Sequence, residues 1–345
     1  MTVTPAIPTP RALPAAPRLR WGILGPGSIA GHFVDALRRQ STQQVVVVGS
    51  RSRERAERFA AEHGVERAAG SPEELVDQAD VDVVYIATPH DSHRQLAELA
   101  LRGGKHILVE KPFATTVADA TAILDLALAE GRFAMEAMWT RYLPQADVLR
   151  QLLESGAIGE PTFVSADFGF VAPFDPGHRL FSPALGGGAL LDAGVYPVSF
   201  IESVLGAPRS VLAAGTLAPT GVDDHVQLAL DFEGGALASA TTSLRAALPV
   251  TAVISGTGGR VEVHSPYLRP SGLTLSTRAM WGPDDRAAHW EDRALAEPYD
   301  ALHYEADAAA RYIAEGRVES PLHDHAATVA VIGVLEAARS RLGAA

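Results

Sequence analysis

The chain of 345 residues contains no cysteine. Disulfides, thiolate metal sites and a cysteine nucleophile are therefore excluded, and a cytoplasmic location is expected. Positive charge is also scarce, since the formal net charge is −12 at pH 7. Such a surface repels phosphates, so neither nucleic acid nor an anionic membrane is an expected partner. An anionic ligand would have to be held by local cations and backbone N–H groups.

Long hydrophobic runs are missing as well. No stretch reaches the roughly 20 apolar residues that a membrane helix needs, so no transmembrane helix is expected. Residues 1–18 are rich in Pro, Ala and Thr but lack a continuous apolar segment and a twin-arginine pair. They predict a flexible tail rather than a signal peptide. The rest of the chain is long enough for two domains.

Strand and helix signals alternate regularly between residues 19 and 141. Short apolar runs predict buried strands at 21–24, 45–48, 81–87, 105–109 and 133–136. Helices are expected between them, at 28–39, 53–63, from 71, 92–102 and 117–129. This alternation predicts an α/β domain of the Rossmann type, with a doubly wound parallel sheet.

The pattern changes after about residue 142. Strand-like segments at 162–170, 210–217, 225–232, 236–244, 250–255 and 260–264 are joined mostly by short Gly or Asp turns. Helices are expected near 145–154, 302–314 and 326–342. Short turns between strands imply antiparallel pairing. Residues 142–345 therefore predict a second, α+β domain with a large, mostly antiparallel sheet.

A glycine-rich turn follows the first predicted strand. Gly25 and Gly27 match the first two positions of the dinucleotide fingerprint, and Ala30 takes the third small position. A pyrophosphate would rest on the start of the helix at Ser28, where N–H groups are free. The alternative is a plain glycine turn between a strand and a helix.

The end of the second predicted strand bears on the choice of cofactor. An NAD site usually has an acid there, whereas this chain has Ser50 and Arg51 and no acid until Glu54. A guanidinium matches the geometry of a 2′-phosphate, so NADP is the expected cofactor, with NAD possible. The alternative is that these arginines only solvate the start of a helix.

Glu110, Lys111 and Pro112 follow a strand-like run, at the carboxyl end where a parallel sheet presents residues to its ligand. A cation there can polarise an oxygen beside a nicotinamide, which indicates a hydride-transferring oxidoreductase. His90 and His93 lie near Asp91 after another strand, but no further ligand has suitable spacing. No metal is expected.

These motifs, with Gly104-Lys105-His106 and Ala87-Thr88-Pro89, resemble the Gfo/Idh/MocA oxidoreductases. The resemblance covers the chain from about Leu19 to its end. It implies these cofactor-binding residues: Gly25, Pro26, Gly27, Ser28, Ile29, Ser50, Arg51, Arg55, Ala87, Thr88, Pro89, His93, Glu110 and Lys111.

Three longer motifs, at 135–144, 185–196 and 221–224, are similar to the family branch that contains dimeric dihydrodiol and NADP-dependent D-xylose dehydrogenases. Tyr196 stands where many family members have histidine, as it does in that branch. The resemblance implies a Rossmann domain followed by a domain at residues 142–345 whose open sheet binds substrate and forms oligomers. It also implies NADP, a sugar, polyol or diol substrate, and a homodimer or higher homo-oligomer. Pro197 follows at once and predicts that the helix restarts there.

The resemblance implies three catalytic residues. Tyr196 would accept the hydroxyl proton, Lys111 would lower its pKa and stabilise charge on the substrate oxygen, and Asp192 would orient Lys111 or bind a hydroxyl. The alternatives are a core tyrosine, a surface lysine and a capping aspartate. Expected substrate residues are Trp139, Arg141, Phe174, His178, Arg179, Asp192 and Tyr196.

The expected function is NADP-dependent oxidation of a cyclic sugar, polyol or vicinal diol. An NAD-linked inositol or amino-sugar dehydrogenase is the alternative among enzymes. The other alternative is a non-catalytic dinucleotide-sensing regulator, which would not need Lys111 or Tyr196.

Overall fold

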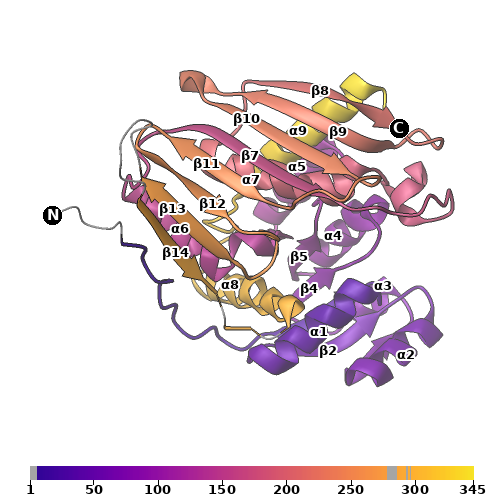
Figure 1. Ribbon diagram of the computed structural model, residues 1–345. Helices are drawn as coiled ribbons and strands as arrows, with labels where there is room; N and C mark the ends of the chain where they lie inside the picture. Colours follow the sequence, from indigo (N-terminus) through magenta and orange to yellow (C-terminus); the bar gives the residue numbers. More distant parts are fainter. Residues whose placement is uncertain (1–5, 278–285, 293, 296) are drawn as a thin grey trace. The chain divides into compact units, whose positions relative to one another are not determined.

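The computed structural model describes residues 6–277, 286–292, 294–295 and 297–345 (Figure 1). The chain divides into two compact units. The Rossmann unit comprises Pro14–Tyr142 and Ala296–Ile332, and the open-sheet unit comprises Met1–Leu13, Leu143–Leu295 and Gly333–Ala345. The segment Ala296–Ile332 thus belongs to the same compact unit as the Rossmann sheet. The sequence-based division of the chain at residue 142 assigns this segment to the second domain.

The sheet of the Rossmann unit has six strands in the order β3-β2-β1-β4-β5-β6, and every neighbouring pair is parallel. The predicted doubly wound sheet is confirmed, with its switch point between β1 and β4. The strands are β1 (Arg20–Leu24), β2 (Gln44–Gly49), β3 (Arg67–Ala69), β4 (Val83–Ile86), β5 (His106–Glu110) and β6 (Ala134–Ala137).

The helices of this unit begin and end close to where the sequence placed them. They are α1 (Ser28–Gln40), α2 (Arg53–His63), α3 (Pro72–Val76), α4 (His93–Arg102), α5 (Val117–Ala129) and α8 (Leu302–Ala314). Phe33 packs α1 against the sheet. Its ring stacks on the Tyr85 ring, with the ring centroids 4.1 Å apart, and meets the Trp21 ring edge-on at a centroid distance of 5.6 Å. All three side chains are fully buried.

The open-sheet unit contains an eight-stranded sheet in the order β14-β13-β12-β11-β7-β10-β9-β8. Neighbours are antiparallel except β7 and β10, which are parallel, so the largely antiparallel prediction is confirmed. The strands are β7 (Pro161–Gly169), β8 (Ser210–Leu217), β9 (Asp223–Asp231), β10 (Leu237–Ser243), β11 (Ala252–Gly256), β12 (Gly259–Val263), β13 (Gly272–Thr277) and β14 (Arg286–Glu291).

Three helices contribute to this unit: α6 (Pro144–Glu154), α7 (Val195–Leu205) and the end of α9 (His325–Leu342). Helix α7 packs against β7 and β10. The described part of the N-terminal segment is attached to α6, because the Arg11 N–H donates to Asp147 at 2.7 Å and Gln151 Nε2 donates to the Thr9 carbonyl at 2.9 Å.

One segment corrects an expectation about apolar runs. The helical stretch Pro183–Leu205 is long enough to span a membrane and contains 18 successive residues with a mean hydropathy of 1.3. Of these 18 residues, 78% are buried inside the protein. Its apolar character is therefore that of a helix in the core of a folded unit.

Candidate functional site

The glycine turn after β1 is shaped by a close backbone approach. Gly25 has a φ of 99°, and a Cβ there would lie 2.7 Å from the Ala87 carbonyl oxygen. Gly25 is therefore required both by its dihedral angle and by its contact with the end of β4. A Cβ at Gly27 would meet nothing within 4 Å, so open space lies beside the start of α1.

The start of α1 is free to bind an anion. Within the described residues no side chain caps this end of the 13-residue helix, and its first turn contains no acidic residue. Its first N–H groups therefore remain available, with the positive end of the helix dipole behind them. Together with the space at Gly27, this arrangement fits a dinucleotide pyrophosphate.

The arginines that follow β2 fall into two groups, those with an ion-pair partner and those without one in the described residues. Arg53 is committed to Glu74 at 2.6 Å, and the first acid after the strand, Glu54, pairs with Arg58 at 2.7 Å. Arg51 and Arg55 are exposed, and neither forms an ion pair within the described part of the chain. Ser50, Arg51 and Arg55 thus lie near one another in sequence. The two guanidinium groups have no ion-pair partner among the described residues, and such groups suit the binding of a phosphate.

His93 links two loops inside the Rossmann unit. Its Nε2 lies 3.0 Å from the Thr88 carbonyl and its Nδ1 lies 3.1 Å from the Pro112 carbonyl. The ring is fully buried, and burial lowers the pKa of His93. A neutral imidazole has one N–H, so it donates to one of these carbonyls at a time. His93 thus connects the loop after β4 with the loop after β5, and each of these loops carries predicted cofactor-binding residues.

Buried side chains hold the backbone that carries Lys111. We call residues 111–113 the lysine turn. Glu110, at the end of β5, accepts hydrogen bonds from the Tyr85 hydroxyl and, at 3.2 Å, from the Lys111 N–H. Burial raises the pKa of the Glu110 carboxyl. Glu136 on β6 accepts from the Phe113 N–H at 2.8 Å. The lysine backbone is therefore fixed, while its side chain is partly exposed.

Glu305 on α8 is a third buried carboxyl in this unit. The residue is fully buried, and neither side-chain oxygen has a hydrogen-bond partner in the described structure. Burial raises the pKa of Glu305 well above its usual value, and the carboxyls of Glu110 and Glu136 raise it further. Glu305 therefore retains its proton beyond the pH at which a free glutamate loses it.

Trp139 and Arg141 were expected in the substrate pocket, and both are buried in the Rossmann unit. The Trp139 ring stacks on Tyr299 at 6.0 Å, and Tyr299 stacks on His32 of α1 at 4.2 Å. The structure therefore gives Trp139 a packing role within its own unit, through the segment that returns after the second sheet.

Two sequence motifs meet in the open-sheet unit. Leu190–Gly194 forms a π-helical turn that carries Asp192, and α7 continues from Val195 with Tyr196. Pro197 lies in the first turn of α7, and the π-helical turn runs directly into this helix. The helix therefore does not restart at Pro197 as predicted, since α7 begins at Val195. The buried carboxylate of Asp223 accepts from the Leu190 N–H at 2.6 Å, and burial raises its pKa to about 6. Asp223 therefore anchors the turn that carries Asp192 and leads into α7.

The predicted substrate residues of this unit are only partly brought together. Arg179 forms an ion pair of 2.7 Å with the buried carboxylate of Asp192. Phe174 is half-exposed and meets Phe181 edge-on at 5.1 Å. His178 is exposed, and its Nδ1 accepts from the Leu180 N–H at 3.3 Å. The guanidinium of Arg179 is therefore a direct partner of Asp192.

Two tyrosines of the open-sheet unit differ in how deeply they are buried. The ring of Tyr196 is partly exposed and meets Phe168 edge-on at 5.6 Å. Tyr267 is buried, and its pKa is raised well above the usual value by burial, with Asp167 and Tyr196 adding to the effect. Tyr267 therefore keeps its proton, which leaves Tyr196 as the better candidate for a base.

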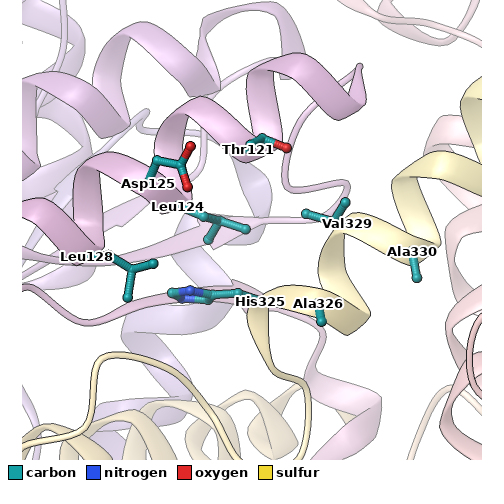
Figure 2. A pocket seen from close by; sticks show the side chains of 8 residues that line it. All are labelled: Thr121, Leu124, Asp125, Leu128, His325, Ala326, Val329 and Ala330. Carbon is teal, nitrogen blue, oxygen red and sulfur yellow. The ribbon is translucent and has the colours of Figure 1, made fainter.

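A hollow of about 380 Å³ lies between α5 and the start of α9 (Figure 2). Its walls are mostly apolar, and none of the predicted site residues lines it. The lining residues are Thr121, Leu124, Asp125, Leu128, His325, Ala326, Val329 and Ala330. In the described part of the chain no three metal-ligating side chains converge. The hollow therefore offers no alternative to the glycine turn and the lysine turn as the cofactor-binding and catalytic site, and the described residues offer no metal cluster as one.

Comparison with known proteins agrees with this geometry. Residues 19–137 match the family described as "Oxidoreductase family, NAD-binding Rossmann fold", and residues 147–262 match the "GFO/IDH/MocA C-terminal domain". The chain belongs to the Gfo/Idh/MocA oxidoreductase family. This family member is accordingly an oxidoreductase with an NAD(P)-binding Rossmann domain.

Several relatives cover nearly the whole chain. Trans-1,2-dihydrobenzene-1,2-diol dehydrogenase of Mus musculus is 34% identical over 94% of this chain and 97% of its own length. A crystal structure of aldose-aldose oxidoreductase from Caulobacter crescentus with glycerol has a TM-score of 0.82 at 26% identity, covering 95% of this chain and 98% of that one. A 3-ketoreductase from Actinomadura kijaniata with NADP has a TM-score of 0.79 at 26% identity, covering 94% and 98%.

Sequence reasoning missed the buried polar groups around the lysine turn. Glu136 lies inside the motif at 135–144, so a signal existed, but it gave no reason to assign that residue a role. Tyr85 and His323 carry no local signal, because the carboxylates that they contact, Glu110 and Glu136, lie 25 and 187 residues away in sequence. Glu305 carries none either, since its side-chain oxygens have no hydrogen-bond partner in the described structure.

Glu305→Met is expected to stabilise this family member, increasingly so as the pH rises. Below about pH 4 the residue is protonated in both the folded and the unfolded state. Above that pH the unfolded state loses the proton while the folded state keeps it, so the wild-type free energy of unfolding falls by up to about 1.4 kcal/mol per pH unit until Glu305 ionises. Methionine removes this cost and the unpartnered oxygens.

Urea denaturation between pH 5 and pH 8 checks this expectation. Glu62→Met, which replaces an exposed glutamate of α2, serves as the control and should show no growing difference. A gain for Glu305→Met that stays constant or shrinks over this range would show that Glu305 ionises normally in the folded protein.

Proposed function

We propose that this protein is an NADP-dependent dehydrogenase that transfers a hydride between the nicotinamide and a cyclic sugar, a polyol or a vicinal diol. The curated relative from Mus musculus, named for a dihydrodiol substrate and 34% identical, supports the substrate class. The observation that carries the proposal is Lys111, a lysine on a side-chain-held turn at the carboxyl end of β5. Ligands of doubly wound sheets bind at that edge.

Each group of the site has a part in this reaction. The bound cofactor supplies a hydride acceptor at its nicotinamide ring. Tyr196, as a phenolate, accepts the proton of the substrate hydroxyl, and the Lys111 ammonium stabilises negative charge on the same oxygen. Asp192, held by Arg179 at 2.7 Å, binds a further hydroxyl of the substrate.

A substrate screen tests the proposal. Aldoses, cyclic polyols and trans-1,2-dihydrobenzene-1,2-diol are offered with NADP⁺ and with NAD⁺, and formation of the reduced nicotinamide is followed by its absorbance. Turnover of an inositol or amino sugar with NAD⁺ would favour the alternative enzyme. Binding of NADP with no turnover of any alcohol would favour a dinucleotide sensor. The expected cytoplasmic location stays a prediction.

Arg51→Asp is expected to weaken NADP binding and to leave NAD binding unchanged. Arg51 follows β2, is exposed and has no ionic partner in the described residues. Losing a charged contact with a 2′-phosphate costs about 1.5–3 kcal/mol, which is roughly a ten- to hundredfold rise in the dissociation constant. Arg58→Asp makes the same charge change on α2 and serves as the control. Tighter binding of NAD than of NADP by the unchanged protein would overturn the cofactor preference.

Lys111 and Tyr196 are expected to act as one unit. Lys111→Ala and Tyr196→Phe should each lower kcat by about a hundredfold or more, because they act on the same carbon–oxygen centre. The double variant should be little slower than the slower single variant. NADP affinity should survive in Tyr196→Phe, and the pH profile of oxidation should rise with a pKa below that of free tyrosine.

Tyr267→Phe is the control for this experiment, because Tyr267 is buried in the same unit and retains its proton. Its turnover should stay within a few-fold of the unchanged enzyme. If Tyr196→Phe instead kept nearly full turnover on a verified substrate, the base would have to be another group, with Asp192 the next candidate.

The protein is expected to form a homodimer through one face of its large sheet. Phe163, Leu212 and Leu237 are exposed by 41%, 65% and 53%, and the strand register places them on one face. Val164 and Ala238, which point to the other face, are buried where α7 packs. An exposed apolar sheet face of this kind marks a protein contact, and a symmetric dimer is the most common way to cover one.

Light scattering at micromolar concentration measures this assembly. The unchanged protein should show about twice the chain mass of 36.4 kDa. The double variant Leu212→Asp/Leu237→Asp should shift toward the monomer, whereas Leu128→Asp, at an exposed leucine of α5, should not. A monomeric unchanged protein would refute the expected dimer.

A further inference from the structure

The lysine turn is contacted by a buried acid–histidine pair. Glu136 Oε1 accepts from the Phe113 N–H at 2.8 Å, and Glu136 Oε2 lies 2.7 Å from His323 Nε2. Both side chains are fully shielded from solvent. Each carboxylate oxygen thus has a separate partner, one on the turn and one on the segment that returns after the second sheet.

His323 is itself held in place. The Ser320 hydroxyl oxygen accepts from the His323 N–H at 3.3 Å and from the Leu322 N–H at 3.1 Å. The Tyr142 hydroxyl also donates to Ser320, at 2.8 Å. His323 Nδ1 has no partner in the described structure, so the geometry assigns the proton to Nε2, facing the carboxylate.

These contacts form one continuous series of hydrogen bonds inside the Rossmann unit. It leads from Tyr142 through Ser320, His323 and Glu136 to the Phe113 N–H. The last group lies two residues after Lys111. His323 is 187 residues away from Glu136 in sequence, so the series joins the end of the chain's second half to the turn that carries the lysine.

A buried pair of this kind is a poor choice for packing alone. Well-packed apolar residues of similar volume usually give equal or greater stability than a buried polar pair. The pair does, however, fix a backbone N–H in one direction, which an apolar side chain cannot do. Because a lysine side chain extends about 6 Å, a rotation of the turn by roughly 10° moves its ammonium by about 1 Å, and such a displacement can cost about a hundredfold in rate.

We propose that Glu136 and His323 are positioning residues, which hold the lysine turn so that the Lys111 ammonium meets the substrate oxygen. The inference rests on the proposed function, because it assigns Lys111 a part in the reaction. Neither residue touches substrate or cofactor in this role. Their effect is therefore on kcat, while the affinities for NADP and for the alcohol stay nearly constant.

Two variants of Glu136 separate positioning from packing. Glu136→Met removes both acceptors and should lower kcat about tenfold or more, with KM for the alcohol and the Kd for NADP within about threefold. Glu136→Gln keeps an amide oxygen that accepts from the Phe113 N–H, so kcat should stay within about threefold of the unchanged enzyme. A role in packing alone would give no such rescue at equal folded fraction.

His323→Phe is tested beside a matched control. It should lower kcat about tenfold, because Glu136 loses its partner and can turn away from Phe113. His303→Phe also replaces a buried histidine, one whose Nδ1 lies 2.7 Å from the Asp300 carbonyl in the same returning segment. This control should change kcat by less than about twofold. Circular dichroism gives the folded fraction of each variant.

The assay uses trans-1,2-dihydrobenzene-1,2-diol and D-xylose with NADP⁺, and it includes Lys111→Ala. If the unchanged enzyme turns over neither alcohol nor any other compound of the substrate screen, the proposed function fails. If Lys111→Ala retains turnover, the activity stands, but the part of Lys111 in the reaction fails and the positioning role fails with it. If Lys111→Ala is inactive while Glu136→Met and His323→Phe keep kcat within about twofold, the positioning role alone is overturned. If Glu136→Met does not fold, the comparison of His323→Phe with His303→Phe decides the question.

Discussion

The site depends on how the backbone after β5 is held. Three side chains contact the lysine turn: Glu110 accepts from the Lys111 N–H, His93 contacts the Pro112 carbonyl, and Glu136 accepts from the Phe113 N–H. They come from the end of β5, the start of α4 and the middle of β6. A flexible lysine is thus mounted on a backbone with little freedom, as catalysis by preorganised charge requires.

This arrangement places several ionisable groups out of contact with water. Glu110 is compensated by the Tyr85 hydroxyl and the Lys111 N–H, and Glu136 by Phe113 and His323. Glu305 has no such partner and keeps its proton. Buried carboxyls oppose stability unless they are paired or protonated, so their concentration beside one turn indicates a functional constraint on this region.

The sequence was sufficient for the features that local chemistry determines. The glycine turn, the β-branched run of β2 and the strand that ends at Glu110 predicted the Rossmann sheet, because each carries its own periodicity or turn residues. It missed β3, which is three residues long, and β14, which has no regular alternation of apolar and polar residues. It also missed β13, although the alternation of Leu273, Thr274 and Leu275 is a strand signal. The apolar stretch Pro183–Leu205 was underestimated, since small residues interrupt it.

The sequence was less informative about the site itself. It indicated Lys111 and Tyr196 through motifs, but His323 reaches Glu136 across 187 residues, and no local pattern encodes such a contact. Similarly, Arg179 and Asp192 were each expected to face substrate, whereas the structure pairs them at 2.7 Å. Contacts between distant residues depend on the whole fold, so only the structure could show them.

The most direct test of the account follows one hydrogen atom. Trans-1,2-dihydrobenzene-1,2-diol with deuterium on both hydroxyl-bearing carbons is incubated with the enzyme and NADP⁺, and the reduced nicotinamide is examined by mass spectrometry. The account predicts that one deuterium is transferred to the nicotinamide ring, because the hydride passes directly from carbon to cofactor while the hydroxyl proton leaves separately. Reduced cofactor without deuterium, with the label released to water, would contradict it.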